Sequence, residues 1–140
     1  MIWTLQIKLL SGRWAETDWE ATVALDETST LEALHRLIQQ AVDFDNDHLH
    51  SFFVARTPRS RERTLCDEQE GIEPWKIPIN SLFPLPKGRK LFYLFDYGDY
   101  WLFQVARSRL KPYEAESGAA YPKVIAEQGD KPSQYPTWDE

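Results

Sequence analysis

Two aspartates separated by a short turn stand in the most aromatic stretch of the chain. Asp96 and Asp99 enclose Tyr97-Gly98, and aromatic and apolar residues flank this turn from Leu91 to Phe103. Two neighbouring carboxylates can divide acid and base roles between them, or they can hold a hard cation. The same side chains can instead accept hydrogen bonds from the amides of the turn. We favour the turn-fixing role.

Histidines supply the second set of candidate residues. His48 and His50 have the spacing that places two side chains on one face of a strand, and such pairs occur among zinc ligands. His35 lies upstream on a helical pattern, and Cys66 is the single cysteine. Nothing in their spacing brings these residues together. We therefore predict no metal and no cofactor.

The sequence contains no motif that is typical of a catalytic nucleophile. No serine lies in a Gly-x-Ser-x-Gly elbow, and the six glycines form neither a phosphate-binding loop nor a dinucleotide fingerprint. We expect a protein that is not an enzyme. The alternative that stays open is a hydrolase or nuclease-type enzyme that uses Asp96, Asp99 and His48.

Four arginines crowd into residues 56–63, namely Arg56, Arg59, Arg61 and Arg63. Arginine is well suited to bidentate phosphate contacts, so nucleic-acid association through this segment is a third hypothesis. The chain as a whole has a net charge of -6, which gives it no general attraction to nucleic acid or to an anionic membrane. We expect a solvated loop whose arginines balance nearby acids, and we expect no membrane partner.

Length and composition limit the kind of fold that can position these residues. A chain of 140 residues with 42% hydrophobic content fits one domain with one core. A single cysteine forms no intramolecular disulfide, and the first residues lack the pattern of a signal peptide. We expect a cytoplasmic protein.

The hydrophobic pattern predicts strands around one main helix. Alternation at residues 3–9 and 19–25 predicts a hairpin, with Trp3 and Trp19 on the buried faces. Residues 29–42 predict a helix, because Ser29 and Glu32 match a capping box and apolar residues recur at helical spacing. Further strands are expected at 51–55 and in an aromatic hairpin at 90–107, with a short strand or helical turn at 77–83.

This order predicts an α+β fold, a mostly antiparallel mixed sheet with one main helix packed on it and a β-grasp-like beginning. We expect a single domain over residues 1–126, with 56–69 as a loop. Residues 127–140 are polar and contain prolines, which is typical of a flexible tail.

Several short motifs occur in an order that is typical of one family. They are Trp19, Thr30-Leu31-Glu32-Ala33-Leu34-His35, Asp47-His48-Leu49-His50-Ser51-Phe52, Phe95-Asp96-Tyr97-Gly98-Asp99-Tyr100-Trp101 and Tyr121-Pro122-Lys123. The chain resembles the plasmid pRiA4b ORF-3-like family over nearly its whole length. That resemblance implies a compact α+β domain and no established activity. The chain departs from the family pattern at Glu20 and Ala21, where two arginines are expected, and it lacks the cysteines that many relatives carry near the C-terminus.

We therefore expect a non-enzymatic protein-binding or interaction module. A protein or peptide partner would be held by exposed members of an aromatic set: Trp14, Tyr97, Tyr100, Trp101 and Trp138. The full set of candidate binding residues is Asp96, Asp99, Tyr100, Trp101, His48, His50, Arg56, Arg59, Arg61 and Arg63. The partner and the oligomeric state are left open.

Overall fold

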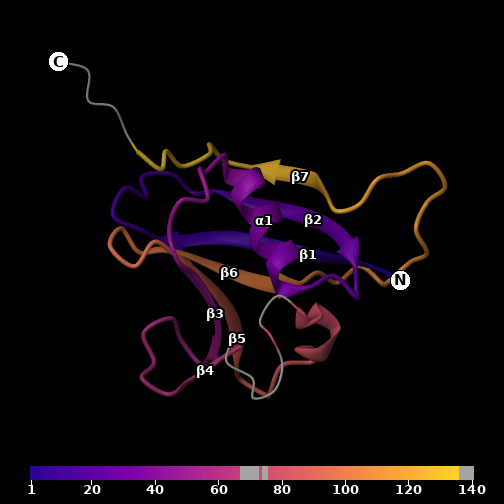
Figure 1. The fold of residues 1–140 in the computed structure, drawn as a ribbon, viewed down its shortest axis with the longest axis horizontal. Coiled ribbons are helices and arrows are strands. Elements are labelled where there is room, and N and C mark those ends of the chain that lie inside the picture. The colour runs from indigo at the N-terminus through magenta and orange to yellow at the C-terminus, as the bar shows by residue number, and fades with distance from the viewer. Residues whose placement is uncertain (67–72, 74–75, 136–140) are drawn as a thin grey trace.

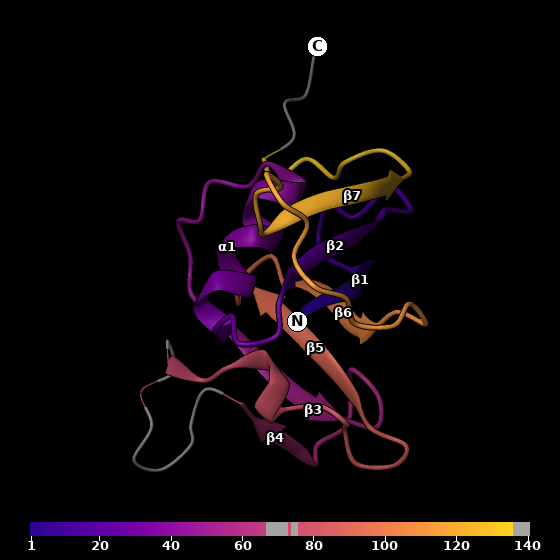
Figure 2. The same cartoon turned by 90° about the vertical axis from the view of Figure 1, so that its right-hand side faces the viewer.

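The computed structural model describes residues 1–66, 73 and 76–135. Within them, seven antiparallel strands form one sheet in the order β4-β3-β5-β6-β1-β2-β7, and one α-helix lies across a face of it (Figures 1 and 2). This confirms the α+β prediction. The elements are β1 (Ile2–Ser11), β2 (Glu20–Asp26), α1 (Leu31–Val42), β3 (His50–Ala55), β4 (Arg63–Leu65), the 3-10 helix η2 (Ile79–Ser81), β5 (Lys90–Phe95), β6 (Trp101–Arg107) and β7 (Lys123–Gln128).

The core lies between α1 and the sheet, where the alternation of the strands predicts it. The inward residues of β1 and β2 are all buried in this core: Trp3, Leu5, Ile7, Leu9, Ala21, Val23 and Leu25. The helix covers them with Leu31, Leu34, Ile38 and Ala41, which lie on one face because they recur every three or four residues. A smaller cluster on the opposite face of the sheet contains Phe53, Phe92 and Leu102.

The N-terminal cap of α1 differs by one residue from the prediction. Thr30, not Ser29, is the cap, and its hydroxyl accepts a hydrogen bond from the Ala33 amide at 3.2 Å. Ser29 is held in the preceding turn, where its amide donates to the Asp26 carbonyl oxygen. The helix ends at Val42 as expected, and Asp43 closes it in the left-handed conformation.

The aromatic hairpin forms as predicted, and alternate residues of its strands face opposite sides of the sheet. β5 pairs with β6 from Leu91↔Val105 to Phe95↔Trp101. Trp101 lies on the same face of β6 as Phe103 and Val105, because they are two and four residues further along the strand. This face is directed toward α1, and Trp101 is fully buried. Trp101 is therefore not among the exposed aromatics that a partner would meet.

Two short edge strands were not expected from the sequence. β4 forms inside the predicted 56–69 loop by pairing with β3, and β7 forms by pairing with β2. The domain boundary that we expected at residue 126 falls inside β7. Beyond it, Gln134 is buried and hydrogen-bonded to Asp45 and Asp47, in the segment that follows α1. Residues 136–140, including Trp138, lie outside the described residues.

Candidate functional site

Three segments meet where β5 ends and β6 begins, and we call this end of the sheet the acidic tip. It comprises residues 43–50, which join α1 to β3, the turn at residues 96–100, and the pair Gln134 and Tyr135. The β3–β5 register brings the first two together, because His50 lies opposite Phe95 and the Asp96 amide donates to the Leu49 carbonyl oxygen at 2.9 Å. The turn lies at the left-hand end of β6 in Figure 1.

Asp96 holds the turn in shape. One of its carboxylate oxygens, Oδ1, accepts hydrogen bonds from the amides of Gly98 at 3.0 Å and Asp99 at 3.2 Å. Its backbone has a φ of 62°, in the left-handed region that aspartate tolerates better than most residues. These contacts support the turn-fixing role that we favoured for Asp96.

The second carboxylate oxygen of Asp96 faces His48. Their Oδ2 and Nε2 atoms are 3.4 Å apart, and Asp96 is only 7% exposed. The structure thus brings together two of the three residues of the hydrolase hypothesis. The third, Asp99, lies beside Arg13 at 3.8 Å and its carbonyl oxygen accepts from the Arg13 amide.

The tail of the chain completes the surroundings of His48. The Tyr135 hydroxyl lies 2.7 Å from His48 Nε2 and donates to Asp47 at 2.7 Å, while the Gln134 side chain donates to the other oxygen of Asp47. The hydrogen bond to the Asp47 carboxylate raises the pKa of Tyr135 to about 12, and the same bond lowers the pKa of Asp47.

Beneath this surface, four residues close a ring of hydrogen bonds. Gln39 donates to the Tyr93 hydroxyl, Tyr93 lies 2.6 Å from His35 Nδ1, and His35 Nε2 lies 2.6 Å from the Asn46 side-chain oxygen. The backbone N–H of Asn46 donates back to the side-chain oxygen of Gln39 at 3.0 Å. Because the Asn46 oxygen can only accept, Nε2 carries the His35 proton and Nδ1 accepts from Tyr93. Every member is satisfied when His35 is neutral.

His50 stacks on His35 and does not join His48. The two rings are 3.6 Å apart and nearly parallel, with an angle of 6° between them. Burial lowers the pKa of His50, and burial together with the neighbouring His50 lowers the pKa of His35 to about 4. Burial also raises the pKa of Tyr93. Both imidazoles are therefore neutral at pH 7.

The arginine segment lies at the opposite end of β3 from His50. Arg56, Arg59 and Arg61 are exposed there. Arg63 is structural, because its guanidinium lies 4.2 Å over the Phe53 ring and donates to the carbonyl oxygens of Pro58 and Ser60. In the described part of the chain, no three or more His, Cys, Asp or Glu side chains are grouped so that they could hold a metal ion.

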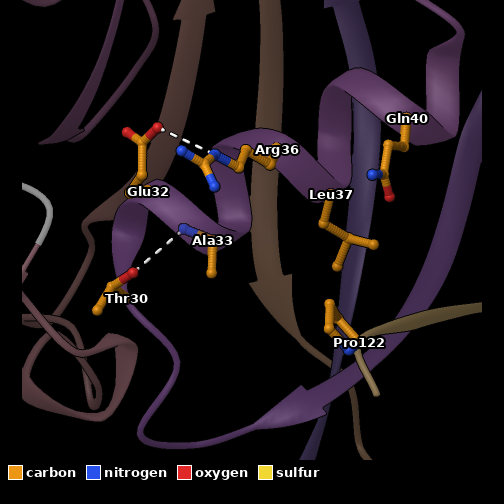
Figure 3. Close-up of a pocket in the computed structure, with 7 residues that line it drawn as sticks. All are labelled: Thr30, Glu32, Ala33, Arg36, Leu37, Gln40 and Pro122. Atoms are coloured by element: carbon orange, nitrogen blue, oxygen red, sulfur yellow. Dashed lines mark hydrogen bonds and ion pairs between the residues drawn. The ribbon is translucent and has the colours of Figure 1, made fainter. Parts of the chain in front are cut away.

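An open hollow lies on the outer side of α1, against Pro122 (Figure 3). Its volume is about 760 Å³. Its polar groups bind one another, since Glu32 pairs with Arg36 at 3.3 Å and the Thr30 hydroxyl caps the helix. The hollow therefore offers a ligand few polar groups without partners. No helix in the described residues is long and apolar enough to cross a membrane.

The sequence patterns did not identify several residues at this tip or in the hydrogen-bonded ring beneath it. Tyr93, Asn46, Gln134 and Tyr135 come from four separate segments that only the fold brings together. One signal was available, because His35 and Gln39 are four residues apart and so lie on one face of the helix.

Asp96→Ala is expected to lower the free energy of unfolding by roughly 2 kcal/mol, because two amides lose their acceptor and alanine is strained at positive φ. Urea denaturation of the purified variant measures this change. Asp96→Asn is the matched control, since asparagine keeps an acceptor oxygen and tolerates this backbone conformation. Equal losses in the two variants would contradict the turn-fixing role.

Comparisons with known proteins agree with this fold. A family model described as "Plasmid pRiA4b ORF-3-like protein" matches residues 5–134. No curated protein matches the chain. A crystal structure of a protein of unknown function, MM3350 from Methanosarcina mazei Go1, is similar with a TM-score of 0.69 and 21% identity, covering 90% of this chain and 68% of that one. At this identity the likeness shows the fold alone. The chain belongs to the plasmid pRiA4b ORF-3-like family.

Proposed function

We propose that this chain is a non-enzymatic protein-binding module and that the acidic tip is its binding surface. The observation that carries the proposal is the exposure of large apolar and aromatic side chains there. Of the eight such residues exposed in the described part of the chain, four belong to the tip: Leu49 (72%), Tyr97 (53%), Tyr100 (40%) and Tyr135 (48%). Tyrosine at such a surface supplies contact area at a low cost in conformational entropy.

The contacts around these side chains keep them on one surface. The Tyr97 hydroxyl donates to the His50 carbonyl oxygen at 3.3 Å, Tyr135 contacts His48, and Leu49 is hydrogen-bonded to the turn through its carbonyl group. Backbone conformations with positive φ are also concentrated at the tip. Every non-glycine residue with positive φ in the described ranges lies here: Asp43, Asn46, Asp96 and Tyr100. Strained backbone is concentrated at functional sites in many proteins.

Charge indicates the chemistry of the partner. Asp43, Asp45 and Asp47 are exposed beside the aromatic residues. A surface of carboxylates around apolar side chains complements a peptide or loop that carries lysine or arginine next to apolar residues. We propose such a basic, partly apolar protein segment as the partner. We also place the protein in a reducing cytoplasm, because its single cysteine, Cys66, is a buried thiol.

Removing the aromatic side chains tests this function. The double variant Tyr97→Ala/Tyr135→Ala is expected to lose the proteins that the wild-type chain retains from a lysate of its own cells, as measured by quantitative mass spectrometry. The matched control is Val124→Ser/Ile125→Ser, since these residues on β7 are similarly exposed, at 41% and 44%. Equal retention by the two double variants would argue against the tip as the binding surface.

A hydrolase or nuclease-type enzyme is the second candidate, and the observation that favours it is the contact between His48 and Asp96. A carboxylate 3.4 Å from an imidazole can orient a general base. Within the described residues, however, Asp96 also serves the turn amides and Asp99 faces Arg13. A hydrolytic activity that disappears in His48→Gln, in a variant that still folds, would favour the enzyme over the binding module.

Nucleic-acid association through Arg56, Arg59 and Arg61 is a weaker candidate, since Arg63 is occupied by its own loop. Phosphate contacts would make binding fall steeply as the salt concentration rises.

A further inference from the structure

A second hollow lies at the opposite end of β5 and β6 from the acidic tip, and we call it the basic pocket. It opens between the start of β5, the end of β6 and residues 83–85, with a volume of about 320 Å³. Its apolar walls include Phe83, Leu85 and Val105. This volume is at the lower end of the range for small-molecule sites, roughly 300–1,000 Å³.

Three cationic residues line the same pocket. They are Arg89, Lys90 and Arg107. The β5–β6 pairing ends at Leu91↔Val105, and Arg89 lies two residues before Leu91 while Arg107 lies two residues after Val105. The two arginines therefore lie at the same end of the hairpin, and like charges held near one another repel. Among the residues that the structure describes, none of the three forms an ion pair.

The apolar wall also fixes one of these cations in place. The Arg107 guanidinium lies 3.9 Å over the ring of Trp3, which itself packs edge-to-face against Phe83 with ring centroids 5.9 Å apart. Stacking of this kind orients an arginine while leaving its N–H groups available for a bidentate contact with an anion.

We propose that the basic pocket binds a small organic anion with an apolar body, such as an aryl or short alkyl group bearing a carboxylate or phosphate. A neutral ligand would leave the repelling cations uncompensated, and an inorganic anion would leave the apolar wall in water. The local excess of positive charge stands out in a protein whose net charge is -6. This site is separate from the acidic tip and independent of the function proposed for it.

A series of four probes tests the pocket by isothermal titration calorimetry on the whole chain. Phenylacetate carries both required features, phenylacetamide lacks the charge, and acetate lacks the apolar body. Phenyl phosphate distinguishes a phosphate head group from a carboxylate. We expect phenylacetate or phenyl phosphate to bind at least about tenfold more tightly than phenylacetamide and acetate. The tighter of the two anions identifies the head group.

Variants locate the binding. Arg107→Gln and Arg89→Gln are each expected to weaken binding of the preferred anion about tenfold, because each removes a charged contact. Lys131→Gln removes an exposed cation outside the pocket and is expected to leave affinity unchanged. Thermal denaturation confirms that each variant is folded. Equal affinity for phenylacetate and phenylacetamide, or an equal loss in Lys131→Gln, would overturn the proposal. Neither result depends on protein binding at the acidic tip.

Discussion

Trp101→Ala is expected to lower the free energy of unfolding by about 4 kcal/mol, a large part of the stability of an ordinary domain. The ring is fully buried, and it packs against Phe44 with ring centroids 5.0 Å apart. It also lies against Gly12, so closely that a Cβ added there would be 2.6 Å from the ring. Alanine would leave a large cavity at this close-packed position. Urea denaturation followed by circular dichroism measures the loss.

Tyr97→Ala is the matched control for this prediction. Tyr97 is an aromatic residue in the same turn region, but it is half exposed, and its removal is expected to change stability by no more than about 0.5 kcal/mol. If Trp101→Ala were as stable as Tyr97→Ala, the placement of Trp101 in the core would be wrong. Loss of binding in Trp101→Ala would report unfolding. Binding at the tip is therefore tested at Tyr97 and Tyr135.

The sequence predicts the strands well because period-two alternation records which face is buried. The alternation at residues 3–9 and 19–25 correctly placed Trp3 and Trp19 in the core, and the same alternation in β6 puts Trp101 with Phe103 on the buried face. The short edge strands β4 and β7 carry no comparable signal. β7 is exposed along most of its length. Its formation as a strand therefore depends more on pairing with β2 than on its own hydrophobic pattern.

The candidate site was harder to predict, because its contacts join segments that are distant in the sequence. The contact between His48 and Asp96 follows from the pairing of β3 with β5, which local patterns do not reveal. Asp96 was recognisable as a turn residue because a glycine follows it closely. The sequence did not indicate that its second carboxylate oxygen faces His48. Tyr135 reaches the tip from the far end of the chain, and no local rule could have placed it there.

The antiparallel topology also explains why two surfaces of opposite charge lie on one small sheet. β3 begins at the acidic tip and is followed by Arg56, while β5 begins at Lys90 beside the basic pocket and is followed by Asp96. Each strand therefore carries acidic residues at one end and basic residues at the other. The negative charges at one end and the positive charges at the other partly cancel, so the net charge of the chain does not reveal either surface.

The stability of the fold is expected to decrease by as much as about 3 kcal/mol when the pH falls from 6.5 to 4. The pKa of His35 is about 4 in the folded protein and 6.5 for an ordinary histidine, so between these values the unfolded chain binds a proton that the folded chain does not. The contribution of neutral His35 is therefore complete above pH 6.5 and is lost as the pH falls toward 4. His50 acts in the same direction.

The structural cause is the closed ring of hydrogen bonds around His35. A proton on Nδ1 would turn this acceptor into a donor facing the Tyr93 hydroxyl, which already accepts from Gln39. It would also place a charge in a side chain that is 2% exposed and stacked on His50. Denaturation across this pH range measures the decrease, and NMR titration of the wild-type imidazoles assigns it. His35→Gln is expected to flatten the pH dependence while lowering stability throughout. A His35 ring that titrates near pH 6.5 in the folded protein would contradict the neutral ring.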